Sequence, residues 1–178
     1  RFFGRDGLFL VYLSTLMIPQ AVIVIPLFLM MSRLGWVNTY QGLILPVAFG
    51  SFGTFLMRQF FLTIPMELEE AAMIDGCSRL RILLSIFLPL AFPALGLLAL
   101  FTFTAQWNSF LWPLIVVNST EHSTIPIGLT SFQGQNGTQW NFLMAGAAIS
   151  MVPGLALTLL LQKYIFKGIA ISSGFGGR

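Results

Sequence analysis

Four long stretches without a charged side chain constrain this sequence more than any other feature. They run over residues 7–32, 34–57, 82–120 and 123–162. A helix that crosses a bilayer needs about 20 mostly apolar residues, so each stretch can hold one. With 56% hydrophobic and 8% charged residues, the chain also cannot build the surface of a water-soluble domain, which carries roughly 25% charged residues. The sequence therefore predicts an all-α integral membrane protein.

Four transmembrane helices are expected, at residues 7–32, 42–62, 90–116 and 142–162. The third is entered through Pro89 and Pro93, and the polar, glycine-bearing segment SFQGQNGTQWN precedes the fourth. Pro19 and Pro26 predict kinks in the first span, because proline breaks helix hydrogen bonds. Small residues at four-residue intervals along the fourth span predict a stripe that packs against another helix; they are Gly146, Ser150 and Gly154.

The distribution of positive charge predicts the orientation in the membrane. With four spans, both ends of the chain and the middle loop share one side, and only Arg33 falls on the other. Cytoplasmic loops carry the excess of lysine and arginine, so both ends and the loop over residues 63–89 are expected in the cytosol. The positive residues on that side are Arg1, Arg5, Arg58, Arg79, Arg81, Lys163, Lys167 and Arg178.

The middle loop holds a compact charged block, LEEAAMIDGCSRLRILLSIFLPL. Acidic residues near Pro65 suit the N-terminal end of a helix. Gly76 can end that helix in the left-handed conformation, and Ser78 can cap a second helix over residues 79–88. We expect a cytosolic helix–turn–helix. The simplest interpretation is a solvated connector, and a docking surface is the alternative.

The block resembles the EAA loop of binding-protein-dependent ABC importers. Glu70, Ala71 and Ala72, then Asp75 and Gly76, stand at the family spacing, and the block continues through Ile86, Leu88 and Pro89. Segments such as WNSFLWPLIVV and LQKYIFKGIA are similar to permease subunits of the carbohydrate group, which includes maltose and glycerol-3-phosphate importers. The similarity covers the C-terminal two thirds of such a subunit, so two further spans are expected upstream.

The resemblance implies a type I importer permease core in a bacterial inner membrane. It implies that the coupling loop over residues 63–89 docks on a dimer of ATP-binding cassette ATPases, with Glu70 paired to a basic residue. ATP and magnesium would be bound by that partner, because this chain carries no Walker motif, general base or nucleophile set. A second permease subunit, an extracytoplasmic solute-binding protein and the lipid bilayer are the other expected partners, and nucleic acid is not.

Polar side chains inside the third span are candidates for the translocation path. Gln106 and Asn108 flank Trp107 in the sequence TAQWNSF. Amides at such depth need a cavity or another helix beside them. Beside an aromatic ring they suit a sugar, and hydrogen bonding between helices is the alternative.

Three other functions compete with import of a sugar or sugar-like solute. The same architecture could carry amino acids, peptides or ions. A secondary carrier or channel without an ATPase would typically place ionisable residues at mid-membrane, which these spans lack apart from Arg58 near one end. A membrane scaffold would have no need of Gln106 and Asn108. A metal site is not expected, because Cys77 and His122 are the only residues of their kinds.

Overall fold

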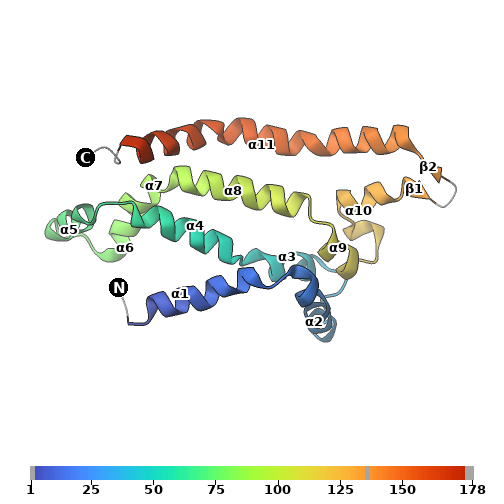
Figure 1. Cartoon of the computed structure of the whole chain (residues 1–178), viewed down its shortest axis with the longest axis horizontal. Coiled ribbons are helices and arrows are strands. Elements are labelled where there is room, and N and C mark those ends of the chain that lie inside the picture. The colour runs from blue at the N-terminus through green and yellow to red at the C-terminus, as the bar shows by residue number, and fades with distance from the viewer. Residues whose placement is uncertain (1–2, 135–136, 175–178) are drawn as a thin grey trace. The chain divides into compact units, whose positions relative to one another are not determined.

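The computed structural model describes residues 3–134 and 137–174, and these residues are mostly helical (Figure 1). The chain divides into two compact units. The first comprises Arg1–Phe52 with Thr104–Leu155, and the second comprises Gly53–Phe103 with Ala156–Arg178. Three helices, α4 (Ser51–Leu62), α8 (Phe92–Trp107) and α11 (Trp140–Gly174), begin in one unit and end in the other.

The first unit holds most of the short helices. Its helices are α1 (Arg5–Ser14), a 3-10 turn (Thr15–Met17), α2 (Gln20–Arg33), α3 (Tyr40–Ala48), α9 (Leu111–Val116), a 3-10 turn (Thr120–His122) and α10 (Ile125–Thr130). A two-residue antiparallel pair, β1 (Gln133–Gly134) with β2 (Gly137–Thr138), follows α10. This pair is a small departure from the all-helical expectation.

The predicted first span is sharply bent in the structure. The axes of Arg5–Met17 and α2 differ by 99°, with the break at Ile18 and Pro19. Ile18 is extended at φ −85° and ψ 117°, because the ring of a following proline disfavours the helical conformation. Pro26, in contrast, lies inside α2. Pro19 is therefore the proline that redirects the chain.

The predicted third span is also interrupted. It is helical over α8, leaves the helix at residues 108–110 and resumes as α9. Pro113 has no backbone N–H to donate within a helix. The break places it in the first turn of α9, where a backbone N–H would have no acceptor within the helix. Upstream, α8 meets the segment Arg79–Leu90 at a bend of 69°.

Two segments of the described residues are by themselves long and apolar enough to cross a membrane. They are Tyr40–Leu62, which comprises α3 and α4, and Trp140–Gln162 of α11. The count rises to as many as four when each bent pair is taken as one span. Four spans with the expected boundaries remain a prediction.

A cluster around Trp112 forms the core of the first unit. Its buried members are Val24, Met31, Trp112 and Val116, which come from α2 and α9. The indole N–H of Trp112 donates to the backbone oxygen of Gly42 at 3.2 Å. A Cβ at Gly42 would collide with the backbone oxygen of Trp36. Glycine at this position therefore lets the first turn of α3 pack closely against the backbone of Trp36.

Asn38 ties two loops of the first unit together. It adopts a left-handed φ of 58°, which asparagine tolerates better than most residues. Its side-chain oxygen accepts hydrogen bonds from the backbone N–H groups of Asn118 and Ser119 and from the Ser119 hydroxyl, at 2.9–3.1 Å. The Ser119 hydroxyl also lies 3.1 Å from Nδ1 of His122. The loop over residues 117–124 is thus fastened to the turn before α3.

The small-residue stripe of the fourth span meets other helices within the first unit. A Cβ at Gly146 would lie 2.5 Å from Cδ2 of Leu129 in α10. The backbone oxygen of Ser150 accepts a 2.9 Å hydrogen bond from the indole of Trp107. The packing prediction is confirmed for these two positions, whereas among the described residues no atom outside α11 lies within 4 Å of a Cβ built at Gly154.

The second unit contains the end of α4, the predicted helix–turn–helix and most of α8. The rings of Phe61 and Phe87 are 6.3 Å apart, so the end of α4 packs against the segment that leads to α8. A Cβ at Gly53 would lie 3.3 Å from Leu98, which shows that α4 and α8 approach closely there. Ala91 and Ala94, at the start of α8, are buried in this unit.

Candidate functional site

The helix–turn–helix predicted from the charged block is present. Helix α5 (Met66–Ile74) carries Glu67 and Glu69 in its first turn, where the helix dipole favours carboxylates. Pro65 lies directly before the helix, with ψ 137°. Its extended conformation sets the direction from which the chain enters α5.

The turn after α5 is closed by two backbone hydrogen bonds. Gly76 has φ 78°. The Gly76 N–H donates to the oxygen of Met73 at 3.0 Å, and the Cys77 N–H donates to the oxygen of Ala72 at 2.9 Å. This is the Schellman arrangement, which satisfies the last carbonyls of a helix and favours glycine at the left-handed position. The predicted left-handed conformation of Gly76 at the end of this helix is confirmed.

The second helix of the motif begins as predicted and then changes from an α-helix to a π-helical turn. The Ser78 hydroxyl accepts a hydrogen bond from the N–H of Arg81 at 3.4 Å and caps α6 (Arg79–Ile82). A π-helical turn (Leu83–Phe87) follows, in which the Leu88 N–H bonds to the oxygen of Leu83. The short α7 (Leu88–Leu90) then contains Pro89, whose nitrogen cannot donate. The chain stays helical from Arg79 to Leu90 with its turns widened directly before this proline.

The motif presents a mixed charged and apolar surface. Glu70, Ala71 and Asp75 are exposed, whereas Ala72 is buried against the rest of the motif. Ile74 is 87% exposed. Among the residues that the structure describes, Glu70 and Asp75 have no salt-bridge partner. This surface suits a protein partner, which would bury the apolar side chains and pair with the charges.

The predicted coupling residues fall into two groups. The first group lies in α5 and the turn that follows it, within the helix–turn–helix of α5 and α6 that we call the hairpin. Its members are Glu70, Ala71, Ala72, Asp75 and Gly76. The second group lies in the segment that joins the hairpin to α8 and consists of Ile86, Leu88 and Pro89. Ile86 and Leu88 are half-buried there. All members of the first group except Ala72 are exposed, and the second group connects the helix–turn–helix to α8.

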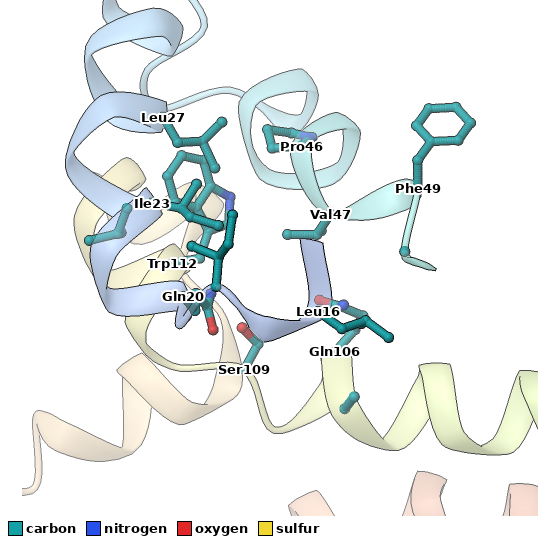
Figure 2. A pocket seen from close by; sticks show the side chains of 14 residues that line it. Leu16, Gln20, Ile23, Leu27, Pro46, Val47, Phe49, Gln106, Ser109 and Trp112 are labelled. Carbon is teal, nitrogen blue, oxygen red and sulfur yellow. The ribbon is translucent and has the colours of Figure 1, made fainter. Parts of the chain in front are cut away.

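A cavity of about 450 Å³ lies within the first unit (Figure 2). Its polar lining residues are Gln20 from the start of α2, Gln106 near the end of α8 and Ser109 from the break that follows. Figure 2 shows these three side chains at one end of the cavity, with Leu27 and Pro46 at the other. The complete lining is Leu16, Ile18, Gln20, Ile23, Val24, Leu27, Pro46, Val47, Phe49, Gly50, Ala105, Gln106, Ser109 and Trp112.

The three residues predicted for the translocation path take different positions. Gln106 lines the cavity. Trp107 instead donates its indole N–H to Ser150 on α11, and the Asn108 amide donates to the backbone oxygen of Thr104 at 2.8 Å. Trp107 is thus bonded to another helix, whereas the Asn108 amide is bonded to its own helix and not across to another one. A path role for all three residues remains a prediction.

Sequence reasoning missed Gln20 and Ser109 as members of the cavity. Gln20 could have been recognised from the sequence, because it is an amide in an otherwise apolar stretch directly after Pro19. Nothing in the sequence singles out Ser109, because serine is common beside the end of a helix. Within residues 3–134 and 137–174, no cluster of His, Cys, Asp and Glu side chains has the arrangement of a metal site.

These features describe a helical membrane protein with an exposed, charged helix–turn–helix and a largely apolar cavity that has polar groups at one end. The chain belongs to the family of binding-protein-dependent transport system inner membrane components, whose profile it matches over residues 1–171. It is 39% identical over 170 residues to the arabinooligosaccharides transport system permease protein AraQ of Halalkalibacterium halodurans, covering 96% of this chain and 61% of that protein. It is likewise 39% identical over 174 residues to the sn-glycerol-3-phosphate transport system permease protein UgpE of Pectobacterium atrosepticum, covering 97% and 62%.

A solved structure supports the same assignment. A chain of a bacterial ABC transporter involved in the import of the acidic polysaccharide alginate superposes with a TM-score of 0.79 and 26% identity, covering 92% of this chain and 63% of that chain. The chain described here therefore spans about three fifths of the length of the relatives it matches. Its fold is that of an ABC importer permease.

Proposed function

We propose that this chain is part of the membrane-spanning permease subunit of an ATP-driven importer for a sugar or sugar-like solute, such as an oligosaccharide or glycerol-3-phosphate. The observation that carries the proposal is the exposed hairpin of α5 and α6, closed at Gly76, in a member of this family. The subunit does not itself hydrolyse ATP. A separate ATPase dimer binds ATP and magnesium, and a second permease subunit and a solute-binding protein complete the importer.

The hairpin can transmit force in both directions. Glu70 is exposed on α5, and a basic residue of the ATPase can form a charge-assisted contact with it. The two turn hydrogen bonds at Gly76 fix the path by which the chain leaves α5 and enters α6, so a displacement of α5 moves α6 as well. The helical segment through Leu88 and Pro89 then passes the movement to α8. Repeated in both permease subunits, this movement alternates access to the solute from the two sides of the membrane.

Loss of Glu70 tests the coupling role. In the complete importer reconstituted in proteoliposomes, we expect Glu70→Ala to lower ATP-driven uptake at least about tenfold. Hydrogen bonds to charged groups contribute about 1.5–3 kcal/mol, and about 1.4 kcal/mol corresponds to a factor of ten. Glu67→Ala is the matched control, because it removes the same charge from the same helix near its N-terminal end, and it should retain uptake within about twofold. Equal uptake by the two variants and the parent importer would contradict the role of Glu70.

We propose that both ends of the chain and the α5–α6 hairpin lie in the cytoplasm of the bacterial inner membrane. The uneven distribution of lysine and arginine supports this orientation. In a Cys77→Ser background, cysteines introduced at Ser85 and Glu121 should react with an impermeant thiol reagent from opposite sides. Intact cells should label the Glu121→Cys protein, and inverted vesicles should label the Ser85→Cys protein. Labelling of both in intact cells contradicts the orientation.

A further inference from the structure

The polar side chains of the cavity have unused hydrogen-bonding capacity. Within the part of the chain that the structure describes, the amides of Gln20 and Gln106 and the hydroxyl of Ser109 have no protein hydrogen-bond partner. Each amide offers two donor hydrogens and a carbonyl acceptor, and the hydroxyl is both donor and acceptor. The groups come from α2, α8 and the break after α8, and they lie at the same end of the cavity (Figure 2). Their capacity matches a ligand that carries several hydroxyl groups.

The opposite part of the lining is apolar and partly aromatic. Trp112 is buried, and its indole N–H is already bonded to Gly42, so it contributes only an apolar ring. Phe49 is 84% exposed and stands at another side of the cavity. Aliphatic side chains fill the rest of the wall. A sugar has both kinds of surface, with hydroxyl groups at its edge and C–H groups on the faces of its ring.

The lining offers no partner for a charged ligand. All of its residues are uncharged, and the cavity lies wholly within residues that the structure describes. A phosphate or carboxylate that enters such a cavity gives up hydration without gaining a cation, which is strongly unfavourable unless the charge is paired. Amide and hydroxyl groups can hydrogen-bond an anion, but they do not neutralise its charge. The chemistry of this wall therefore favours an uncharged ligand.

From this chemistry we infer that the cavity bounded by Gln20, Gln106 and Ser109 binds a neutral polyhydroxylated solute, an uncharged sugar or oligosaccharide rather than a phosphorylated or acidic one. The inference rests on the proposed import function and narrows its solute class. Gln106 and Gln20 are the specificity-determining residues, because their amides replace the water that hydrates the sugar hydroxyls. Trp112 and the aliphatic wall accept the apolar faces of its rings.

The test uses the complete importer with its own solute-binding protein, reconstituted in proteoliposomes. ATP-driven accumulation is measured for three neutral solutes, arabinotriose, maltose and raffinose, and for two anions, sn-glycerol-3-phosphate and an alginate trisaccharide. We expect accumulation of at least one neutral sugar and of neither anion. Accumulation of an anion would overturn the inference and leave the import function standing. Accumulation of none of the five would contradict both.

Variants then connect the selectivity to the cavity. For the accumulated sugar, Gln106→Ala and Gln20→Ala should each raise the KM of uptake about tenfold, with unchanged yield of the assembled complex. Gln41→Ala is the matched control, since Gln41 is an exposed amide on α3 that does not line the cavity, and its KM should stay within twofold. A KM unchanged in both cavity variants would overturn the assignment. If one of the two cavity variants fails to assemble, the KM of the other variant decides.

Discussion

Replacing Gly76 with leucine is expected to abolish ATP-driven uptake by the complete importer while the protein still inserts into the membrane. Gly76 has φ 78°, a conformation that a side chain penalises by about 1–2 kcal/mol. Apart from the neighbouring residues in the chain, no atom of the described residues lies within 4 Å of a Cβ built at this position, so the effect is conformational and not a collision. The substituted turn would relax toward negative φ, which breaks the two hydrogen bonds from Gly76 and Cys77 and changes the angle between α5 and α6.

Gly76→Asn is the matched control for this prediction. Asparagine tolerates the left-handed conformation and is the usual alternative to glycine at a helix C-terminus. Uptake by Gly76→Asn should therefore stay above about a third of the parent value, while Gly76→Leu falls to background and also loses ATPase subunits during purification. Transport should be measured together with the amount of each subunit in the purified complex. Equal loss in both variants would show that the position cannot accept any side chain, and equal retention would falsify the coupling role of the turn.

Truncating Trp112 is expected to produce the largest loss of stability in the first unit. The side chain is 1% exposed and packs with Val24, Met31 and Val116. Removal of a buried tryptophan to alanine typically destabilises a protein by about 3–5 kcal/mol, because the cavity only partly collapses. It also leaves the oxygen of Gly42 without the indole donor. Because helices in a membrane associate mainly through such packing, Trp112→Ala should lower the thermal unfolding midpoint of the purified complex in detergent markedly.

Two further variants separate packing from the loss of an aromatic residue. Trp140, at the start of α11, is 64% exposed, and Trp140→Ala should shift the midpoint far less. Trp112→Phe keeps part of the ring volume but not the N–H, so an intermediate shift is expected from the smaller ring and the lost bond to Gly42. Equal midpoints for Trp112→Ala and Trp140→Ala would contradict the assignment of Trp112 to the core.

Local sequence signals predicted the helix–turn–helix in detail. A left-handed Gly76 and a capping Ser78 depend on residues within about one helical turn, so neighbouring side chains decide them. The structure differs from the predictions where a local sequence signal is compatible with more than one conformation. Pro19 and Pro26 both indicate a kink, yet the chain turns at Pro19 and continues as a helix through Pro26. Which proline redirects the chain depends on packing, here of Val24 and Met31 on Trp112.

The sequence by itself determined the membrane class, the helical content and the turn at Gly76, because hydrophobicity, charge distribution and capping act over short distances. Only the tertiary structure decided which polar groups form the cavity. Gln106 and Trp107 are neighbours, but successive residues of a helix point about 100° apart, and so Gln106 meets the cavity that Gln20 also lines while Trp107 meets Ser150. These partners lie far away in the sequence, and no local pattern specifies which side of α8 each of them occupies.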